Sequence, residues 1–144
     1  MPWGAFFRMR LTRRVFVVDE DQSARNGFAR LLRTAGYDVR EFRTAREFVD
    51  ALEPDATGCV LLDSSTPGMS SEDLQREFQA RNADLTIICV TADGGLGSRQ
   101  IAEELNAVAF FRKPVDGTAL LDAIAWALRS QSVLGSESQR EGSC

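Results

Sequence analysis

Short runs of apolar residues recur along the chain, and a polar residue follows each of them. The four runs are Val15–Val18, Cys59–Leu62, Leu85–Val90 and Val108–Phe111. Their short length and their lack of regular alternation are typical of buried strands in a parallel sheet that is covered on both faces. A fifth segment, Tyr37–Phe42, mixes polar and apolar positions in the manner of a half-buried strand and predicts one more strand.

Segments with apolar residues at helical spacing follow the predicted strands. The first helix is expected over residues 23–35, with Ser23 as its N-cap and Gly36 at its end. Further helices are expected at 44–52 behind a capping box, at 71–80, in a short segment up to about residue 105, and from Asp116 to about residue 129. Strands and helices that alternate through short links predict an α/β fold with right-handed crossovers and a doubly wound sheet.

The chain has 144 residues, which is the length of one ordinary domain. Residues 14–129 hold all the predicted strands and helices and are expected to form that domain. Residues 1–13 contain basic but no acidic side chains and are expected to be a solvated leader. Residues 130–144 are rich in serine and are expected to be a polar tail or linker.

Composition narrows the classes of function. The formal net charge of −4 argues against direct nucleic-acid binding, because proteins that bind nucleic acids usually carry a basic surface. The chain has no histidine, which excludes histidine-based metal sites and triads, and no apolar run long enough to suggest a membrane partner. Cys59 and Cys89 lie inside apolar runs, so we expect them to pack as small hydrophobic residues in a reducing compartment, the cytoplasm.

Polar residues follow four of the predicted strands at the edge where function collects in open α/β sheets. They are Asp19, Glu20, Asp21, Asp63, Thr91 and Lys113. Taken singly, each would be ordinary as a helix cap, a turn residue or a solvated acid. Matched groups at the ends of four strands of one sheet are much less expected by chance.

These groups share one chemistry. Clustered carboxylates repel one another and need a cation, and oxygen ligands with open positions suit Mg²⁺. Asp63 could attack phosphorus as a nucleophile and form an aspartyl phosphate. The Lys113 ammonium and the Thr91 hydroxyl could meet the negative charge of the phosphoryl oxygens. The set indicates metal-assisted phosphoryl transfer and fits acyl transfer or redox chemistry poorly.

Four motifs, in order and at matching spacing, resemble the receiver domains of bacterial two-component response regulators. They are VVDED at 17–21, CVLLDSSTPGMSSEDL at 59–74, VTAD at 90–93 and AFFRKPVD at 109–116. The resemblance covers residues 14–129, and the motifs most resemble those of the nitrogen-fixation type of regulator. It implies a flavodoxin-like, CheY-like fold with five helices and five parallel strands in the order 2-1-3-4-5.

The resemblance implies a phosphoacceptor and a metal site. Asp63 would accept the phosphoryl group. The Mg²⁺ ligands would be Asp19, Glu20, Asp63 and the backbone carbonyl of Ser65, with Glu20 binding directly and Asp19 through water.

Roles for the remaining strand-end residues are also implied. Lys113 would pair with the phosphoryl group, and Thr91 would hydrogen-bond to it. Ala92 is small enough to leave room for the phosphoryl group, and Phe110 would be an aromatic switch that turns inward when Thr91 moves. Pro114 would follow a cis peptide bond.

Three positions depart from the family pattern and keep alternatives open. Glu20 stands where Asp is usual, Thr66 where methionine is usual, and Asn106 where glycine is usual. The first two would suit a pseudo-receiver, a protein-binding module that keeps the fold without being phosphorylated. An enzyme on a similar sheet is a further alternative, although the first strand lacks a loop to cradle a flavin phosphate. An aspartate-based phosphatase would want a second aspartate at the position of Ser65.

As a receiver, the chain is expected to be a signalling protein rather than an enzyme acting on other molecules. It would catalyse its own phosphorylation and dephosphorylation, with Ser65 and Asp93 influencing the rate of dephosphorylation. The expected partner is a histidine kinase or phosphotransfer protein that docks near the first helix. The resemblance also makes a homodimer through the fourth helix, fifth strand and fifth helix possible. The output stays open between a single-domain regulator and a receiver that belongs to a longer protein.

Overall fold

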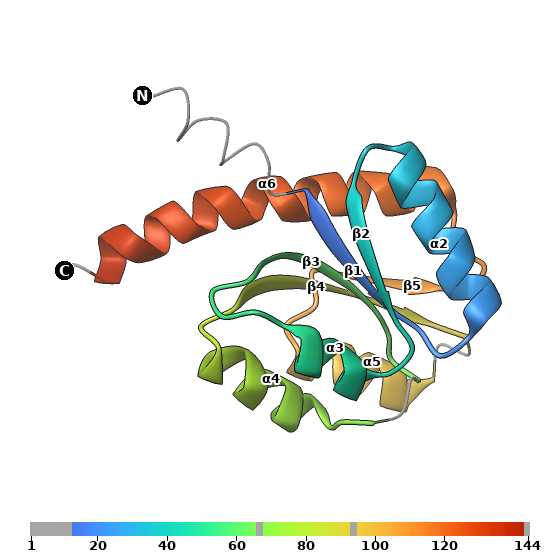
Figure 1. Cartoon of the computed structure of the whole chain (residues 1–144), viewed down its shortest axis with the longest axis horizontal. Helices are drawn as coiled ribbons and strands as arrows, with labels where there is room; N and C mark the ends of the chain where they lie inside the picture. The colour runs from blue at the N-terminus through green and yellow to red at the C-terminus, as the bar shows by residue number, and fades with distance from the viewer. Residues whose placement is uncertain (1–12, 66–67, 93–94, 143–144) are drawn as a thin grey trace.

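Five parallel strands form one sheet in the order β2-β1-β3-β4-β5 (Figure 1). The computed structural model describes the backbone of residues 13–65, 68–92 and 95–142, and the side chains as far as Gln131. The strands are β1 (Arg14–Val18), β2 (Asp38–Phe42), β3 (Thr57–Asp63), β4 (Asp84–Thr91) and β5 (Ala109–Arg112). The predicted strand order is confirmed.

Helices cover both faces of the sheet. Over the described parts of the chain they are α2 (Gln22–Thr34), α3 (Ala45–Ala51), α4 (Ser71–Ala80), α5 (Leu96–Glu104) and α6 (Gly117–Gly142). Helices α2 and α6 lie on one face, and α3, α4 and α5 lie on the other (Figure 1). This arrangement confirms the predicted doubly wound fold with five helices.

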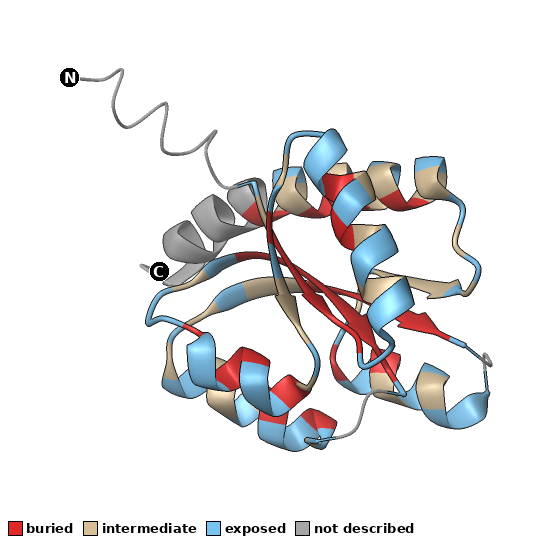
Figure 2. Ribbon diagram, turned by 45° about the vertical axis from the view of Figure 1, so that its right-hand side comes forward, coloured by how far each residue is buried: buried red, intermediate tan, exposed pale blue. Residues whose placement is uncertain are grey.

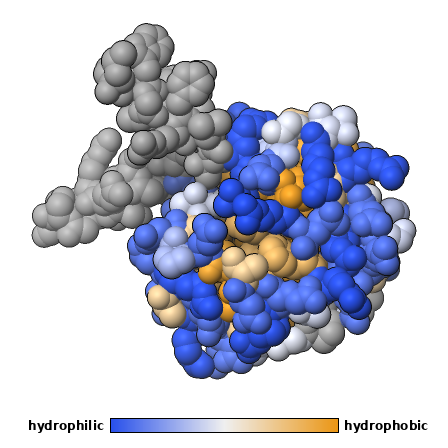
Figure 3. Space-filling view, in the orientation of Figure 1, coloured by the Kyte–Doolittle hydropathy of each residue, from blue (hydrophilic) through white to orange (hydrophobic). Residues whose placement is uncertain are grey.

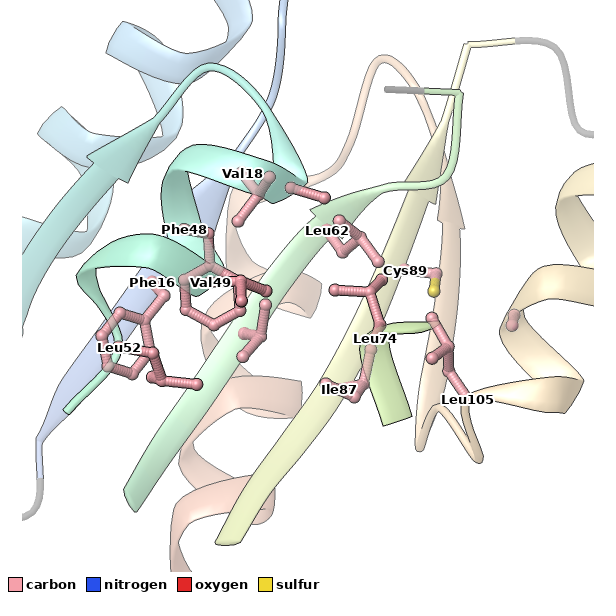
Figure 4. Close-up of a cluster of buried hydrophobic side chains, with 13 residues drawn as sticks. Phe16, Val18, Phe48, Val49, Leu52, Leu62, Leu74, Ile87, Cys89 and Leu105 are labelled. Atoms are coloured by element: carbon pink, nitrogen blue, oxygen red, sulfur yellow. The ribbon is translucent and has the colours of Figure 1, made fainter. Parts of the chain in front are cut away.

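Alternate residues of β1 serve two separate cores, because successive side chains of a strand point to opposite faces. Val15 and Val17 pack with residues of α2 and α6. Phe16 and Val18 pack with residues of α3 and α4, in the cluster drawn in Figure 4. Buried positions run along the strands in the middle of the molecule (Figure 2), so the apolar runs in the sequence form the central layer.

The edge strand β2 carries charges where the central strands carry apolar residues. Asp38 and Arg40 are exposed, and Glu41 is partly so. The face shown in Figure 3 is mostly hydrophilic, with apolar atoms visible mainly in a central area ringed by polar ones. Charges on an edge strand discourage pairing with the sheet of another molecule, so this pattern suits a sheet that ends at β2.

Side-chain caps begin most helices, and one prediction about them is wrong. Thr44 Oγ1 accepts a hydrogen bond from the Glu47 amide at 3.1 Å, and Ser70 caps α4 in the same way, as expected. The N-cap of α2 is Asp21 rather than Ser23, whose own amide donates to Asp21 Oδ1 at 3.0 Å. Both residue types are good N-caps, so the local sequence does not choose between them.

The last helix is much longer than predicted. Helix α6 continues from Gly117 to Gly142, beyond the predicted end at about residue 129 and through most of the expected polar tail or linker. Gln131, at the start of the predicted tail, is buried, and its amide donates to the main-chain carbonyl of Gly58 at 2.9 Å and also to that of Asp84. Because this contact with the sheet is made by polar groups, the pattern of apolar residues in the sequence does not reveal it.

Two further expectations, on the leader and on membrane spans, can be compared only with the described residues. The expected leader lies outside the described residues except for Arg13, which precedes β1. In the described stretches of the chain, no helix is both long enough and apolar enough to cross a membrane.

Candidate functional site

The predicted site residues gather at the carboxyl edge of the sheet because parallel strands all end there. Asp19 directly follows β1, Asp63 ends β3, Thr91 ends β4, and Lys113 directly follows β5. Asp19, Asp63 and Thr91 are buried. The structure brings three of these four side chains into direct contact, namely Asp19, Asp63 and Lys113.

Lys113 bridges two buried carboxylates. Its Nζ donates to Asp19 Oδ2 at 2.8 Å and to Asp63 Oδ2 at 3.0 Å. Its main-chain amide donates to the Thr91 carbonyl at 2.8 Å, which ties the loop after β5 to the end of β4. Burial alone would lower the pKa of the Lys113 ammonium, but the hydrogen bonds that it donates to both carboxylates outweigh this effect and hold that pKa above its ordinary value. Lys113 is therefore a firmly protonated cation at neutral pH.

Asp63 is held as a carboxylate by donors on both of its oxygens. Oδ1 accepts from the Ser65 amide at 2.9 Å and from the Ser65 hydroxyl at 2.6 Å, while Oδ2 accepts from Lys113. Burial raises the pKa of this carboxyl, but the Ser65 and Lys113 hydrogen bonds overcome that effect and leave the pKa below its ordinary value. Asp63 is accordingly charged, and available as a nucleophile, at neutral pH.

Asp19 is also fixed at every polar atom that the structure describes. Its Oδ1 accepts from the Asp21 amide at 2.9 Å, and its main-chain amide donates to the Phe42 carbonyl at 3.0 Å. Desolvation by burial raises the pKa of Asp19 above its ordinary value even though Lys113 donates to it. Burial therefore outweighs the stabilisation that Lys113 and the Asp21 amide give to the charged form of Asp19.

The two predicted switch residues contact the start of α5. Thr91 Oγ1 donates to Ser98 Oγ at 3.1 Å. Phe110 is half-buried at the border of the α3, α4 and α5 core, and the Arg99 guanidinium lies over its ring at 5.8 Å from the centroid. The first turns of α5 therefore contact both residues. Lys113–Pro114 is a cis peptide bond, as the resemblance implied.

Comparison with known proteins assigns the chain to a family. The model of the response regulator receiver domain matches residues 15–125. The chain belongs to the response regulator receiver family. Nodulation protein W of Bradyrhizobium diazoefficiens is 38% identical over 110 residues, which are 76% of this chain and 48% of that protein. The transcriptional regulatory protein FixJ of Azorhizobium caulinodans is 34% identical over 110 residues, which are 76% of this chain and 52% of that protein.

Solved receiver structures agree in fold. Full-length FixJ from B. japonicum superposes with a TM-score of 0.74 at 31% identity, over 88% of this chain and 62% of that one. The response regulator StyR gives a TM-score of 0.72 at 34% identity, over 90% of this chain and 66% of that one. The resemblance to nitrogen-fixation regulators is confirmed, and the protein is a receiver domain of two-component signal transduction. It spans about half the length of the curated relatives it matches.

The carboxylates of the receiver site could hold a hydrated Mg²⁺. Over the described residues, no group of three or more carboxylate or thiol side chains is placed to hold a metal ion by itself. Mg²⁺ usually keeps several waters and takes only one or two carboxylates, so the paired carboxylates of Asp19 and Asp63 would be enough to hold it. Asp19 and Asp63 share the Lys113 ammonium, so this group of three keeps a net negative charge that a further cation would balance, and the next residue after Asp19 is the exposed Glu20.

Several site contacts were not predicted from the sequence. Ser65 was expected to supply a carbonyl ligand and to influence the rate of dephosphorylation, but not to bind Asp63. Its amide and hydroxyl both donate to Asp63, and its position two residues after an aspartate, where a side-chain turn can close, could have indicated this. The contact of Ser98 with Thr91 has no such signal. Thr66 and Asp93, which the sequence also singled out, lie outside the described residues.

Proposed function

We propose that this receiver accepts a phosphoryl group on Asp63 from a phosphohistidine donor. The observation that carries the proposal is the Lys113 ammonium, 3.0 Å from Asp63 Oδ2, beside an Asp63 carboxylate whose pKa is lowered. A nucleophile that is ionised at neutral pH and a fixed cation next to it are the two groups that transfer to a carboxylate needs. Family membership supports the same role.

The transfer would replace one bond to phosphorus by another. An oxygen of Asp63 forms the new bond, and the bond from phosphorus to the imidazole nitrogen of the donor breaks. The electron pair of the broken bond stays on that nitrogen, which can take a proton from water. Lys113 faces the negative charge that the phosphoryl oxygens carry during this step. Because its ammonium is already held in place, it does not have to move when that charge develops.

Receiver domains generally use Mg²⁺, and the acids of this site would hold it here. Asp19, Glu20 and Asp63 would supply carboxylate oxygens, and Ser65 its backbone carbonyl. Bound there, Mg²⁺ would neutralise charge on the phosphoryl oxygens. Glu20 is longer than the usual aspartate by one methylene, so its reach into the site depends on how its backbone is held. The protein would also catalyse loss of its own phosphoryl group to water.

Phosphorylation would act through the contacts at the start of α5. A phosphoryl group on Asp63 offers the Thr91 hydroxyl a stronger, charged acceptor than Ser98. Movement of Thr91 toward it would let Phe110 pack inward and would change the face formed by α5, β5 and α6. Phosphorylation would thus shift the balance between two conformations of this face. We propose that a homodimer could form through the same face.

A groove beside the site suits a docking phosphodonor. It runs between α2 and the segment after β5, and Phe28, Leu31, Pro114 and Val115 give it an apolar floor. Lys113 lines the same groove, so a partner seated there would approach Asp63. We therefore propose that a histidine kinase or phosphotransfer protein binds along α2, in the cytoplasm.

Phosphorylation can be tested by measuring the intact mass after incubation with acetyl phosphate and Mg²⁺. We expect the wild type to gain one phosphoryl group and Asp63→Asn to gain none. Asp122→Asn, at an exposed position on α6, is the matched control and should behave as wild type. A folded wild type that gains no mass would contradict the proposal and favour the pseudo-receiver. Uptake by Asp63→Asn at the normal rate would place the acceptor elsewhere.

A further inference from the structure

A largely buried arginine holds the backbone between the two acids at the end of β1. The Arg25 side chain, in the first turn of α2, is only 12% exposed. Its Nη1 donates to the main-chain carbonyl of Asp19 at 2.8 Å. Asp19 precedes the N-cap of α2, so the hydrogen-bond ladder of the helix does not use this carbonyl. A charged side chain is rarely buried unless it is paired, and here its partner is the chain at the site.

The same peptide unit links Asp19 to Glu20. A peptide bond is planar, so a fixed Asp19 carbonyl also fixes the direction of the Glu20 amide and the position of the Glu20 Cα, from which its side chain extends. On the other side of Asp19, its amide donates to the Phe42 carbonyl at 3.0 Å. The Asp19 backbone is therefore hydrogen-bonded to α2 through its carbonyl and to the end of β2 through its amide.

Glu41 keeps Arg25 in this position. Arg25 Nε lies 3.7 Å from Glu41 Oε1, and Arg33 Nη1 lies 3.0 Å from Glu41 Oε2. Arg33 also donates to the Val39 carbonyl at 3.1 Å, which ties the group to β2. The Glu41 carboxylate thus contacts two guanidinium groups and helps to hold the Arg25 guanidinium in contact with the Asp19 carbonyl.

We infer that Arg25 is a positioning residue for Mg²⁺, because it fixes the peptide unit that carries the two proposed ligands Asp19 and Glu20. The inference rests on the proposed metal site. It matters most for Glu20, whose longer side chain can reach a productive position only if its backbone is well placed. Groups that orient metal ligands without touching the metal typically change affinity by about 10- to 100-fold when they are removed.

The test is the Mg²⁺ dissociation constant, measured by titration calorimetry without any phosphodonor. We expect Arg25→Ala to bind Mg²⁺ at least about tenfold more weakly than wild type. Arg25→Lys should fall between the two, because an ammonium can still donate to the Asp19 carbonyl but lacks the second contact with Glu41. Glu41→Gln should weaken binding less than Arg25→Ala, since it loosens Arg25 without removing it. Arg30→Ala, at an exposed position of the same helix, is the control and should match wild type.

Circular dichroism and urea unfolding would establish that each variant is folded at the temperature of the titration. Folded Arg25→Ala with the wild-type dissociation constant would overturn the inference and leave Arg25 a purely structural residue. If Arg25→Ala does not fold, unchanged Mg²⁺ affinity in both Arg25→Lys and Glu41→Gln would overturn it. A wild type that binds no Mg²⁺ would overturn the metal site together with this inference. A wild type that binds Mg²⁺ but takes up no phosphoryl group would contradict only the proposed transfer.

Discussion

The side-chain amide of Gln131 donates to the main-chain carbonyl of Gly58 at 2.9 Å, although the two residues lie 73 positions apart. The same amide donates to the Asp84 carbonyl. Gly58 belongs to β3 and Asp84 begins β4, so one glutamine of α6 joins two neighbouring strands at the amino edge of the sheet. The contact fastens the last helix at the edge of the sheet opposite Asp63 and Lys113.

Replacing Gln131 by leucine tests this tie. The leucine would keep much of the side-chain volume but leave two carbonyls without their donor, and unsatisfied buried polar groups cost about 1–3 kcal/mol each. We expect the free energy of unfolding from urea titration to fall by about 2 kcal/mol in total, since the carbonyls can recover water in part. Arg129→Ala, two residues earlier and exposed, should change it little. A Gln131→Leu variant as stable as wild type would mean that the tie contributes nothing to folding.

The sequence predicted the elements and the site because both depend on features that repeat locally. Runs such as Val15–Val18 indicate strands by composition alone, and parallel topology then carries Asp19, Asp63 and Lys113 to one edge whatever their separation in the chain. Neither step requires the placement of any individual side chain.

Contacts that depend on side-chain placement escaped prediction. The Thr91–Ser98 hydrogen bond and the grip of Arg25 on Asp19 join groups whose orientation is decided only after packing. The choice of Asp21 over Ser23 as N-cap is of the same kind. Gln131 was assigned to a polar tail because hydropathy registers neither its burial nor the two carbonyls that it satisfies.

Removal of the Lys113 cation should destabilise the fold in a pH-dependent way. Lys113→Met leaves Asp19 and Asp63 buried without their shared partner, and breaking a buried ion pair from one side costs about 3–5 kcal/mol. Without the lysine the pKa values of both carboxyls would rise in the folded state. A raised carboxyl pKa means that the fold gains stability as pH falls. Of these two carboxyls in wild type, this holds for Asp19 alone, and the stabilising contribution of the lowered Asp63 pKa is lost as pH falls.

The difference between Lys113→Met and wild type should therefore be largest at pH 7 and shrink as pH falls toward the acid range. Urea unfolding at pH 7 and pH 5 measures it, with Arg112→Met, at the exposed preceding residue, as control. A gap that stays constant between the two pH values would mean that lost packing, rather than charge, causes the change.

Two glycines should respond to alanine in opposite directions. Gly58 has φ +144°, and an added Cβ would lie 2.7 Å from the Arg14 carbonyl oxygen. Strained backbone of this kind costs about 1–3 kcal/mol, so Gly58→Ala should lower the free energy of unfolding by at least that much. Gly27 lies in α2 with nothing within 4 Å of an added Cβ, so Gly27→Ala should raise it by up to about 1 kcal/mol. Thermal unfolding of the pair against wild type decides the point, and a stabilised Gly58→Ala would contradict the geometry.

Cys59 and Cys89 should resist thiol reagents for as long as the protein is folded. Burial raises the pKa of each thiol to about 12, and Asp63 adds to the effect at Cys89. The thiolate is the reactive form, so at pH 8 only about one molecule in ten thousand would carry it, against roughly a quarter for an unperturbed thiol of pKa about 8.5. Both side chains are also fully buried, so reaction requires the structure to open.

Peptide mapping after treatment with iodoacetamide at pH 8 should show Cys59 and Cys89 unmodified in the native protein and fully modified in 8 M urea. Rapid native labelling at either residue would show that the sheet opens around β3 or β4, and the urea dependence of the labelling rate would say whether that opening is local or global.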